Sequence, residues 1–251
     1  MTDPRDESAR DGTSDSTEPQ AVRERYARRV PADPRYSLLN SAALCAFQER
    51  QRALLARFGA LGGADLSALR LLEVGCGSGG NLVECLLAGF APEHLAGIEL
   101  LAERHCAARA RLPEAVTLLE GDAVALLPAL PAADIVFVST VFSSLLDDAF
   151  QQRLADAMWA AVKPGGGVLW YDFTLNNPRN PDVRGVPLRR VRELFPQGEV
   201  RARRITLAPP VARAVCRVHP SLYTLFNAFP LLRTHVLAWI ARDAEAVQKS
   251  V

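Results

Sequence analysis

The sequence is poor in lysine and in net charge. Lysine occurs only at Lys163 and Lys249, and arginine supplies the rest of the 29 basic residues. This excess of arginine fits a GC-rich coding sequence and carries no functional prediction. Because 28 acidic residues leave a formal charge of +1, we do not expect a protein whose main task is to hold nucleic acid by charge.

Cysteines and long apolar runs are also scarce. The five cysteines form no C-x-x-C pair, so we expect neither a disulfide framework nor a metal site. We expect the protein to reside in a reducing cytoplasm. Residues 1–20 hold no apolar run, and no signal peptide is expected. Polar residues and a proline interrupt the apolar stretch 222–240, so no transmembrane helix is expected either.

The N-terminal part of the chain has two segments of different composition. Residues 1–20 contain six acids and no large aliphatic residue after Met1, which predicts a disordered tail, with an acidic interaction arm as the alternative. Residues 21–251 then form a single domain. Its first part, 21–62, is expected to be helical because apolar residues recur at helical spacing between Leu38 and Phe58.

Short apolar runs alternate with helical patterns between residues 69 and 175. We expect strands at 69–74, 95–100, 116–120, 134–139 and 167–173, helices at 81–88, 102–111 and 147–162, and a turn at 164–166. This alternation predicts an α/β protein with a doubly wound sheet. Beyond it we expect a loop at 176–182, a helix at 188–195, a strand at 200–207, short helices at 209–229, and a strand or helix at 234–240.

A glycine-rich loop follows the first expected strand. Gly75, Gly77 and Gly80 satisfy G-x-G-x-x-G, and glycines there let the backbone approach a ligand at a helix N-terminus. Glu99 ends the second strand, where a carboxylate can accept hydrogen bonds from ribose hydroxyls. Both features suit NAD and S-adenosylmethionine equally.

Further residues separate these two cofactors. Glu73 places a carboxylate in a dry strand end, which is costly unless a cationic amino-acid ligand meets it. Asp122 follows the third strand and offers a carboxylate to an adenine edge. No Tyr-x-x-x-Lys occurs, which removes the usual proton relay of short-chain dehydrogenases.

Residues 73–79, Glu99, 121–123 and 163–166 together resemble the ordered motifs of the class I S-adenosylmethionine-dependent methyltransferases. The resemblance makes residues 69–175 the cofactor-binding core and 176–251 a C-terminal part. It implies a Rossmann-like seven-stranded sheet of order 3-2-1-4-5-7-6 with an antiparallel last strand. Residues 200–207 and 234–240 then become strands six and seven, with a helical insertion between them.

The resemblance also implies how the methionine part of S-adenosylmethionine is held. A loop passes under that part of the cofactor, and it consists of Gly75, Cys76, Gly77 and Gly79. Glu73 helps to hold the amino group through water.

The nucleoside part has its own implied partners. Glu99 takes the ribose hydroxyls, and Leu100 packs on the adenine. Asp122 and Ala123 read the adenine edge, with helix capping as the alternative for Asp122. Ser139 lines the approach to the methyl group.

The chain lacks the acceptor motifs of DNA methyltransferases. Residues 139–142 read Ser-Thr-Val-Phe where amino-methylating DNA enzymes carry Asp/Asn/Ser-Pro-Pro-aromatic, and no cysteine follows a proline. The loop after the fourth strand also lacks a histidine base. Asp148, Asp172 and His219 are therefore the candidate bases, against a helix cap, a loop carboxylate and a structural histidine.

An arginine-rich stretch bears on the acceptor. Nine arginines and two glutamates lie between residues 184 and 217, which indicates an anionic acceptor, such as a phosphate-linked sugar or lipid, or a solvated basic face. We expect residues 209–229 to fold over the strand ends as an acceptor-binding cover. Within them, 222–226 suit peripheral membrane contact or packing as core.

These features predict methyl transfer from S-adenosylmethionine to an oxygen of a small molecule or glycan. Residues 171–178 and 230–235 also resemble bacterial methyltransferases associated with surface-polysaccharide synthesis. The alternatives are an RNA or protein methyltransferase and a non-catalytic cofactor-binding subunit. The sequence sets no oligomeric state.

Overall fold

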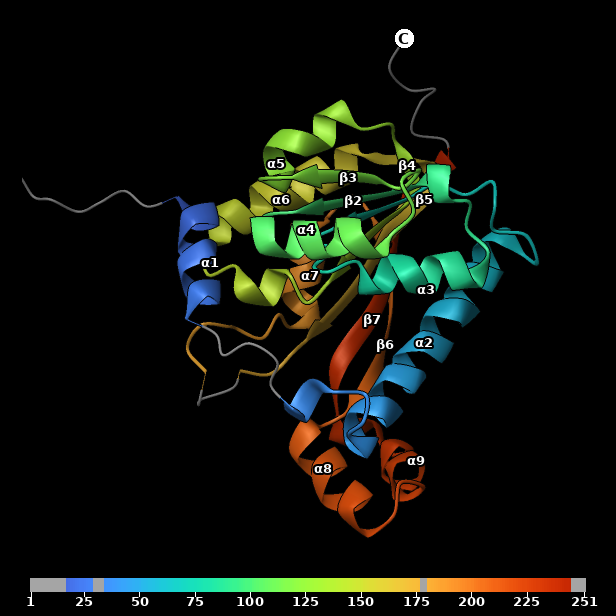
Figure 1. The fold of residues 1–251 in the computed structure, drawn as a ribbon, viewed down its shortest axis with the longest axis vertical. Helices are drawn as coiled ribbons and strands as arrows, with labels where there is room; N and C mark the ends of the chain where they lie inside the picture. Colours follow the sequence, from blue (N-terminus) through green and yellow to red (C-terminus); the bar gives the residue numbers. More distant parts are fainter. Residues whose placement is uncertain (1–16, 29–33, 177–179, 245–251) are drawn as a thin grey trace, which may run out of the picture.

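The computed structural model describes residues 17–28, 34–176 and 180–244, and a single sheet forms its centre (Figure 1). The strand order is β3-β2-β1-β4-β5-β7-β6, with β7 antiparallel to both neighbours and all other pairs parallel. This confirms the predicted fold. The strands are β1 Leu71–Val74, β2 Leu95–Glu99, β3 Thr117–Glu120, β4 Ala133–Ser139, β5 Val162–Phe173, β6 Glu199–Leu207 and β7 Arg233–Ala241.

Helices cover both faces of the sheet (Figure 1). They are α1 Glu18–Ala27, α2 Ser41–Gly62, α3 Gly80–Ala88, α4 Ala102–Arg111, α5 Ala123–Leu126, α6 Asp148–Ala160, α7 Leu188–Leu194, α8 Pro209–Val218 and α9 Leu222–Asn227. Within the described ranges, no helix combines the length and the apolar composition that crossing a membrane requires.

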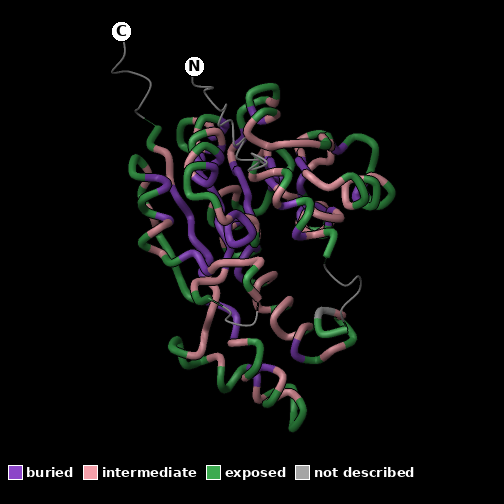
Figure 2. Tube along the Cα trace, turned by 90° about the vertical axis from the view of Figure 1, so that its left-hand side faces the viewer, coloured by how far each residue is buried: buried purple, intermediate pink, exposed green. Residues whose placement is uncertain are grey.

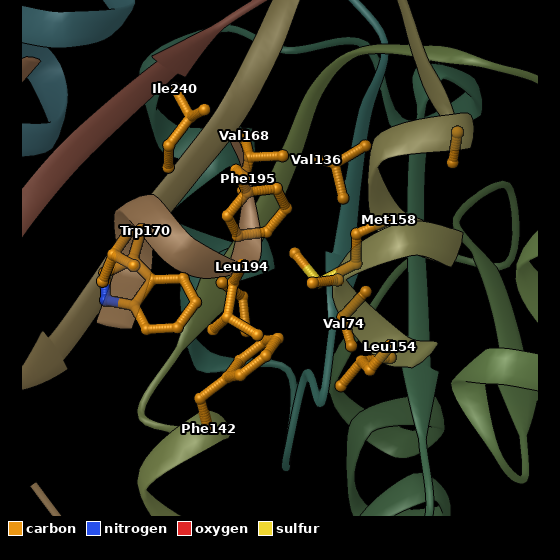
Figure 3. Packing of buried hydrophobic residues seen from close by; sticks show 14 of the residues in the cluster. Val74, Val136, Phe142, Leu154, Met158, Val168, Trp170, Leu194, Phe195 and Ile240 are labelled. Atoms are coloured by element: carbon orange, nitrogen blue, oxygen red, sulfur yellow. The ribbon is translucent and has the colours of Figure 1, made fainter. Parts of the chain in front are cut away.

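Alternating strand residues feed two separate cores. In β4, Val136 shares a core with Met158 of α6 and Leu194 of α7 (Figure 3). Val138 belongs to the same core. Phe137 faces the opposite way, into the core formed with α2, α3 and α4. Because side chains alternate along a strand and both faces are covered, these strands read as continuous apolar runs.

The expected turn at 164–166 is instead part of β5. Val162 already pairs with Ala133 of β4, and the register between the two strands shifts before Ile135. Gly165 has φ +80°, and its N–H donates to the carbonyl of Arg242. Periodicity missed this irregular start because the paired residues are far apart in sequence.

The N-terminal helices differ from the expected segments. α1 begins at Glu18, so the last residues of the expected tail are helical, while residues 1–16 lie outside the described part. α2 begins later than expected because the Asn40 side chain caps it, accepting from the N–H of Ala42 at 3.0 Å. It then continues past Phe58 to Gly62.

The helices α8 and α9 and the start of α2 lie together at the lower end of the molecule (Figures 1 and 2). We call this part, residues 37–44 and 209–232, the tip. Ala42 of α2, Leu207, Ala212 of α8 and Tyr223 of α9 make its small buried core. The predicted strands six and seven are confirmed, and the segment between them is helical as expected. Because β6 runs parallel to β5, the tip continues from the carboxyl edge of the sheet.

Candidate active site

A cavity of about 320 Å³ lies at the carboxyl ends of the first four strands. Residues 73–77, 98–101, 121–123 and 139–141 line it, each group coming from the end of a different strand. This is where parallel α/β sheets bind ligands, because the loops that leave neighbouring strands diverge there.

Some glycines of the loop line the cavity, and another allows two helices to pack closely. Gly75 and Gly77 line the cavity with φ of +68° and +56°, a backbone conformation that favours glycine. A Cβ on Gly75 would lie 2.5 Å from Val141 Cγ2. Gly79 does not line the cavity, and a Cβ there would lie 2.8 Å from Leu112 Cδ1. Gly79 therefore serves the packing of α3 on α4.

Two buried side chains stand behind this loop. Cys76 also lines the cavity, and burial raises the pKa of its thiol, so the thiol stays neutral. Glu73 is fully buried, and its Oε1 accepts from Asn81 Nδ2 at 2.5 Å while Oε2 has no partner among the described residues. Burial raises the pKa of Glu73 to about 8. An ammonium group in the cavity would supply the missing donor.

Glu99 is the second buried carboxylate and has a different environment. Its Oε2 accepts from the N–H of Gly77 at 2.8 Å, and its Oε1 accepts from the N–H of Leu101 at 2.9 Å. Each oxygen keeps a free lone pair, so the carboxylate can still accept from ribose hydroxyls. Glu99 thus shapes the glycine loop and remains available to a ligand.

The chain matches the family described as "Methyltransferase domain" over residues 71–166, the segment that supplies nearly all of these walls. The chain contains a class I S-adenosylmethionine-dependent methyltransferase domain. Its cofactor is S-adenosylmethionine, and the unpartnered oxygen of Glu73 fits the amino group of that molecule. Curated protein sequences give no match.

Solved structures share the fold of this methyltransferase at low sequence identity. A SAM-dependent methyltransferase from Archaeoglobus fulgidus superposes with a TM-score of 0.57 at 15% identity, covering 79% of this chain and 98% of that chain. The magnesium protoporphyrin IX methyltransferase of Synechocystis PCC 6803, with bound SAH, gives 0.57 at 11%, covering 89% and 95%. A glycopeptide N-methyltransferase with SAH gives 0.55 at 17%, covering 77% and 89%.

Arg50 of α2 is a cavity residue that sequence reasoning missed. Its Nη1 donates to Asn81 Oδ1 at 2.7 Å, and its Nη2 donates to Glu84 Oε1 at 2.6 Å. The guanidinium also lies 5.7 Å from the ring centroid of Tyr171. No motif marks Arg50, because only the packing of α2 beside α3 brings it to Glu73.

Three residues were expected to contact the adenine. Leu100, Asp122 and Ala123 all line the cavity of the methyltransferase. Asp122 Oδ1 also accepts from the N–H of Val124 at 2.9 Å and caps α5. The helix cap that was the alternative for Asp122 is therefore present, and the same residue also lines the cavity.

α1 contributes a wall of the cavity that we call the roof, residues 18–26. Pro19, Val22 and Tyr26 face the cavity. Glu18 Oε1 accepts from Arg25 Nη2 at 2.6 Å and from the N–H of Leu146 at 2.7 Å. Arg25 Nη2 donates in turn to the Ser144 carbonyl at 2.9 Å.

The roof corrects two expectations at once. Residues 18–20 were expected to belong to a tail, yet Glu18 anchors the roof and Pro19 lines the cavity. Residues 209–229 were expected to cover the site, but none of them lines the cavity. They pack instead on the start of α2, in the tip. The nine arginines between 184 and 217 are likewise absent from the cavity wall.

None of the three candidate bases lines the cavity. Asp148 is exposed and pairs with Arg184. His219 is exposed at the end of α8, in the tip, where its Nδ1 accepts from the N–H of Ser221. Asp172 is buried and accepts from the N–H of Ser143 at 3.0 Å. Burial raises the pKa of Asp172 to about 7.

Asp172 is thus placed to orient a loop. Ser143 belongs to the turn Phe142–Ser144, and the next two residues, Ser144 and Leu145, line the cavity. Ser139, Thr140 and Ser144 bring hydroxyl groups to this side of the site. Thr140 has φ +54°, a strained conformation for a β-branched residue, and its N–H donates to the Tyr171 carbonyl at 2.8 Å.

Proposed function

We propose that this methyltransferase acts on an oxygen atom of a small molecule or of a glycan unit, phosphate-linked units included. The observation that carries the proposal is the roofed cavity. Its volume of about 320 Å³ is at the low end of the roughly 300–1,000 Å³ of ligand sites, so the cofactor takes up most of it. An acceptor then reaches the methyl group through a small group or a chain end.

We assign the cofactor's amino-acid group to Glu73 and Arg50. Glu73 Oε2 accepts from the ammonium group, since that oxygen has no other described donor. Arg50 supplies a positive charge for the carboxylate, and Asn81 links the two side chains by accepting from Arg50 and donating to Glu73. Glu99 takes the ribose hydroxyls, and Asp122 takes the adenine edge.

When bound, the cofactor supplies a sulfonium methyl group that an acceptor oxygen can attack in line. The chain contributes position and exclusion of water, which can account for a large share of the rate of such a displacement. Ser139, Thr140 and Ser144 offer hydrogen bonds to a polar acceptor at the rim. The roof, anchored by Glu18, shields this end of the cavity.

The described cavity wall carries no histidine. Its carboxylates are those that we assign to the cofactor's amino group, ribose and adenine. We therefore infer that the acceptor oxygen is acidic enough to react without a protein base. Asp172 acts as a positioning residue, because it holds the turn that carries Ser144.

The experiment is methyl transfer by the full chain from methyl-labelled S-adenosylmethionine. Soluble sugars, sugar phosphates and glycans are compared with total RNA and with protein, and the Glu99→Ala variant serves as the negative control. The proposal expects label in a low-molecular-weight or glycan fraction, as an O-methyl group. Label confined to RNA or protein would contradict it. Absence of transfer to every class, with intact cofactor binding, would favour a cofactor-binding subunit.

A further inference from the structure

The tip exposes an unusual amount of apolar surface. Eight of the eleven large hydrophobic side chains that are exposed in the described residues belong to it. Leu39 is 98% exposed, Leu231 91% and Val218 78%, and the aromatic ring of Phe229 is also largely exposed. Scattered exposed leucines need no explanation, but a concentration at one end of a molecule marks an interaction site.

The same end carries charge of one sign. The tip contains two arginines, Arg213 and Arg217, and no acidic residue. On α8, Arg213 and Arg217 are one helical turn apart, and neither forms an ion pair with a described acid. The acid that reaches the tip from α2 is Glu49, and it accepts from Tyr223 Oη at 2.7 Å.

α8 separates these features onto two sides. Ala212 is buried against α2 and β6, and Val211, Val215 and Cys216 pack around it. Residues four positions apart share a helix face, so Arg213 and Arg217 lie together away from this core. Val218, the last residue of the helix, follows Arg217 in the sequence and is exposed.

From this pairing of exposed apolar side chains with arginines, we propose that the tip docks on an anionic lipid bilayer surface. Apolar side chains enter the boundary between headgroups and acyl chains, and arginines bind the phosphates. Aliphatic side chains such as Leu39, Val218 and Leu231 have no use in stacking on nucleic-acid bases. The absence of acids fits an anionic surface better than a mixed-charge protein partner.

Docking would place the active site near the bilayer. β6 ends at Leu207, on the edge of the sheet where the cavity opens, and α8 follows at Pro209. Acceptors that carry a lipid anchor would then arrive at the correct edge of the enzyme. The docking proposal does not depend on the nature of the acceptor, because it concerns a surface outside the cavity.

The test is co-sedimentation of the full chain with vesicles of phosphatidylcholine, alone or mixed equally with phosphatidylglycerol. We expect binding to the anionic vesicles that weakens as salt is added. Arg213→Gln with Arg217→Gln should weaken it roughly 30-fold, at about fivefold for each arginine. Leu231→Ser should weaken it about tenfold.

Matched variants control for general loss of charge or of surface apolarity. Leu87→Ser removes a leucine that is 79% exposed on α3, and Arg189→Gln with Arg192→Gln removes two exposed arginines of α7. Both should bind vesicles like the unchanged chain. All variants should keep the melting temperature and the affinity for S-adenosylhomocysteine.

Three results would overturn the proposal. One is the absence of anionic vesicle binding, and another is equal weakening by the Leu87 and Leu231 variants. The third applies when vesicle binding is absent. In that case the chain forms a concentration-dependent dimer, or binds single-stranded RNA in a salt-sensitive way, and the tip variants abolish that association.

Discussion

Two helical regions flank the carboxyl edge of the sheet, and they are anchored by opposite chemistry. The roof is held to the cavity by hydrogen bonds and a buried ion pair, through Glu18 and Arg25. The tip is held by a small apolar core and by Tyr223, and it leaves apolar residues exposed. The polar helix α1 is therefore part of the active site, while the amphipathic helix α8 lies outside the cavity wall.

The two regions should also differ in whether a single substitution affects cofactor binding. The roof touches the cofactor cavity through Pro19, Val22 and Tyr26, so weakening its anchors should be felt in cofactor binding. The tip shares no residue with the cavity wall. Its substitutions should leave the cofactor unaffected.

The largest expected effect concerns Glu73, at the centre of the cofactor side. Its pKa is raised from 4.5 to about 8 by burial, so the folded ligand-free protein holds a proton that the unfolded chain releases. The stability contributed by this proton is present below pH 4.5 and is lost as the pH rises through about 8. We expect the free energy of unfolding of the Glu73→Gln variant not to decline over this pH range. The decline in the unchanged chain should amount to about a few kcal/mol.

Denaturant unfolding between pH 5 and 8 measures this difference. Glu114→Gln is the control, since Glu114 is exposed between α4 and β3. Parallel pH curves for the unchanged chain and Glu73→Gln would contradict the assignment. Saturating cofactor should reduce the decline, because the ammonium group stabilises the ionised carboxylate.

Glu99→Ala should weaken S-adenosylmethionine binding by about 1.5–3 kcal/mol, through the loss of charge-assisted hydrogen bonds to ribose. It also leaves the N–H groups of Gly77 and Leu101 without their acceptor. Calorimetry with S-adenosylmethionine and with NAD checks this prediction. NAD should not bind, and measurable NAD affinity together with unchanged cofactor affinity would refute the role of Glu99.

On the roof, Glu18→Ala should weaken cofactor binding about tenfold, roughly 1.4 kcal/mol. The change removes the acceptor of Arg25 and of the Leu146 N–H, so α1 can leave the cavity without unfolding the domain. The melting temperature should change little. Glu24→Ala, on the exposed side of α1, is the matched control, and an equal effect of both substitutions would show that the roof does not act through Glu18.

The comparison also explains which parts of the site sequence reasoning could reach. Residues adjacent to strand ends, such as Glu73, Glu99 and Asp122, were predictable because each motif is local and lies at the carboxyl end of a strand. The helix Ala102–Arg111 was predicted with its observed bounds. Gly79 was assigned to the cofactor because its motif does not reveal which way the missing side chain would point.

Residues whose role depends on distant contacts were not predictable. Arg25 meets the carbonyl of Ser144, 119 residues away, and Arg50 meets Glu84 across two helices. A polar N-terminal segment looks like a tail until these partners are known. Conversely, the apolar insertion looked like a cover because sequence does not show that the start of α2 lies between it and the core of the domain.

The smallest expected effect is the sharpest test of the division between roof and tip. Replacing both Arg213 and Arg217 by Glu should leave the dissociation constant of S-adenosylmethionine within about twofold, a shift of roughly 0.4 kcal/mol. These side chains lie outside the cavity wall, and salt screens the interactions of solvent-exposed charges.

The same double variant discriminates between the two regions when turnover is measured on a water-soluble acceptor. An enzyme whose acceptor site lies under the roof should keep its Michaelis constant, because α8 contributes nothing to that wall. A strongly raised Michaelis constant for the soluble acceptor, with cofactor affinity unchanged, would return residues 209–229 to the active site as a cover. It would mean that the tip swings toward the cavity during turnover, and that the roof alone does not enclose the transferring methyl group.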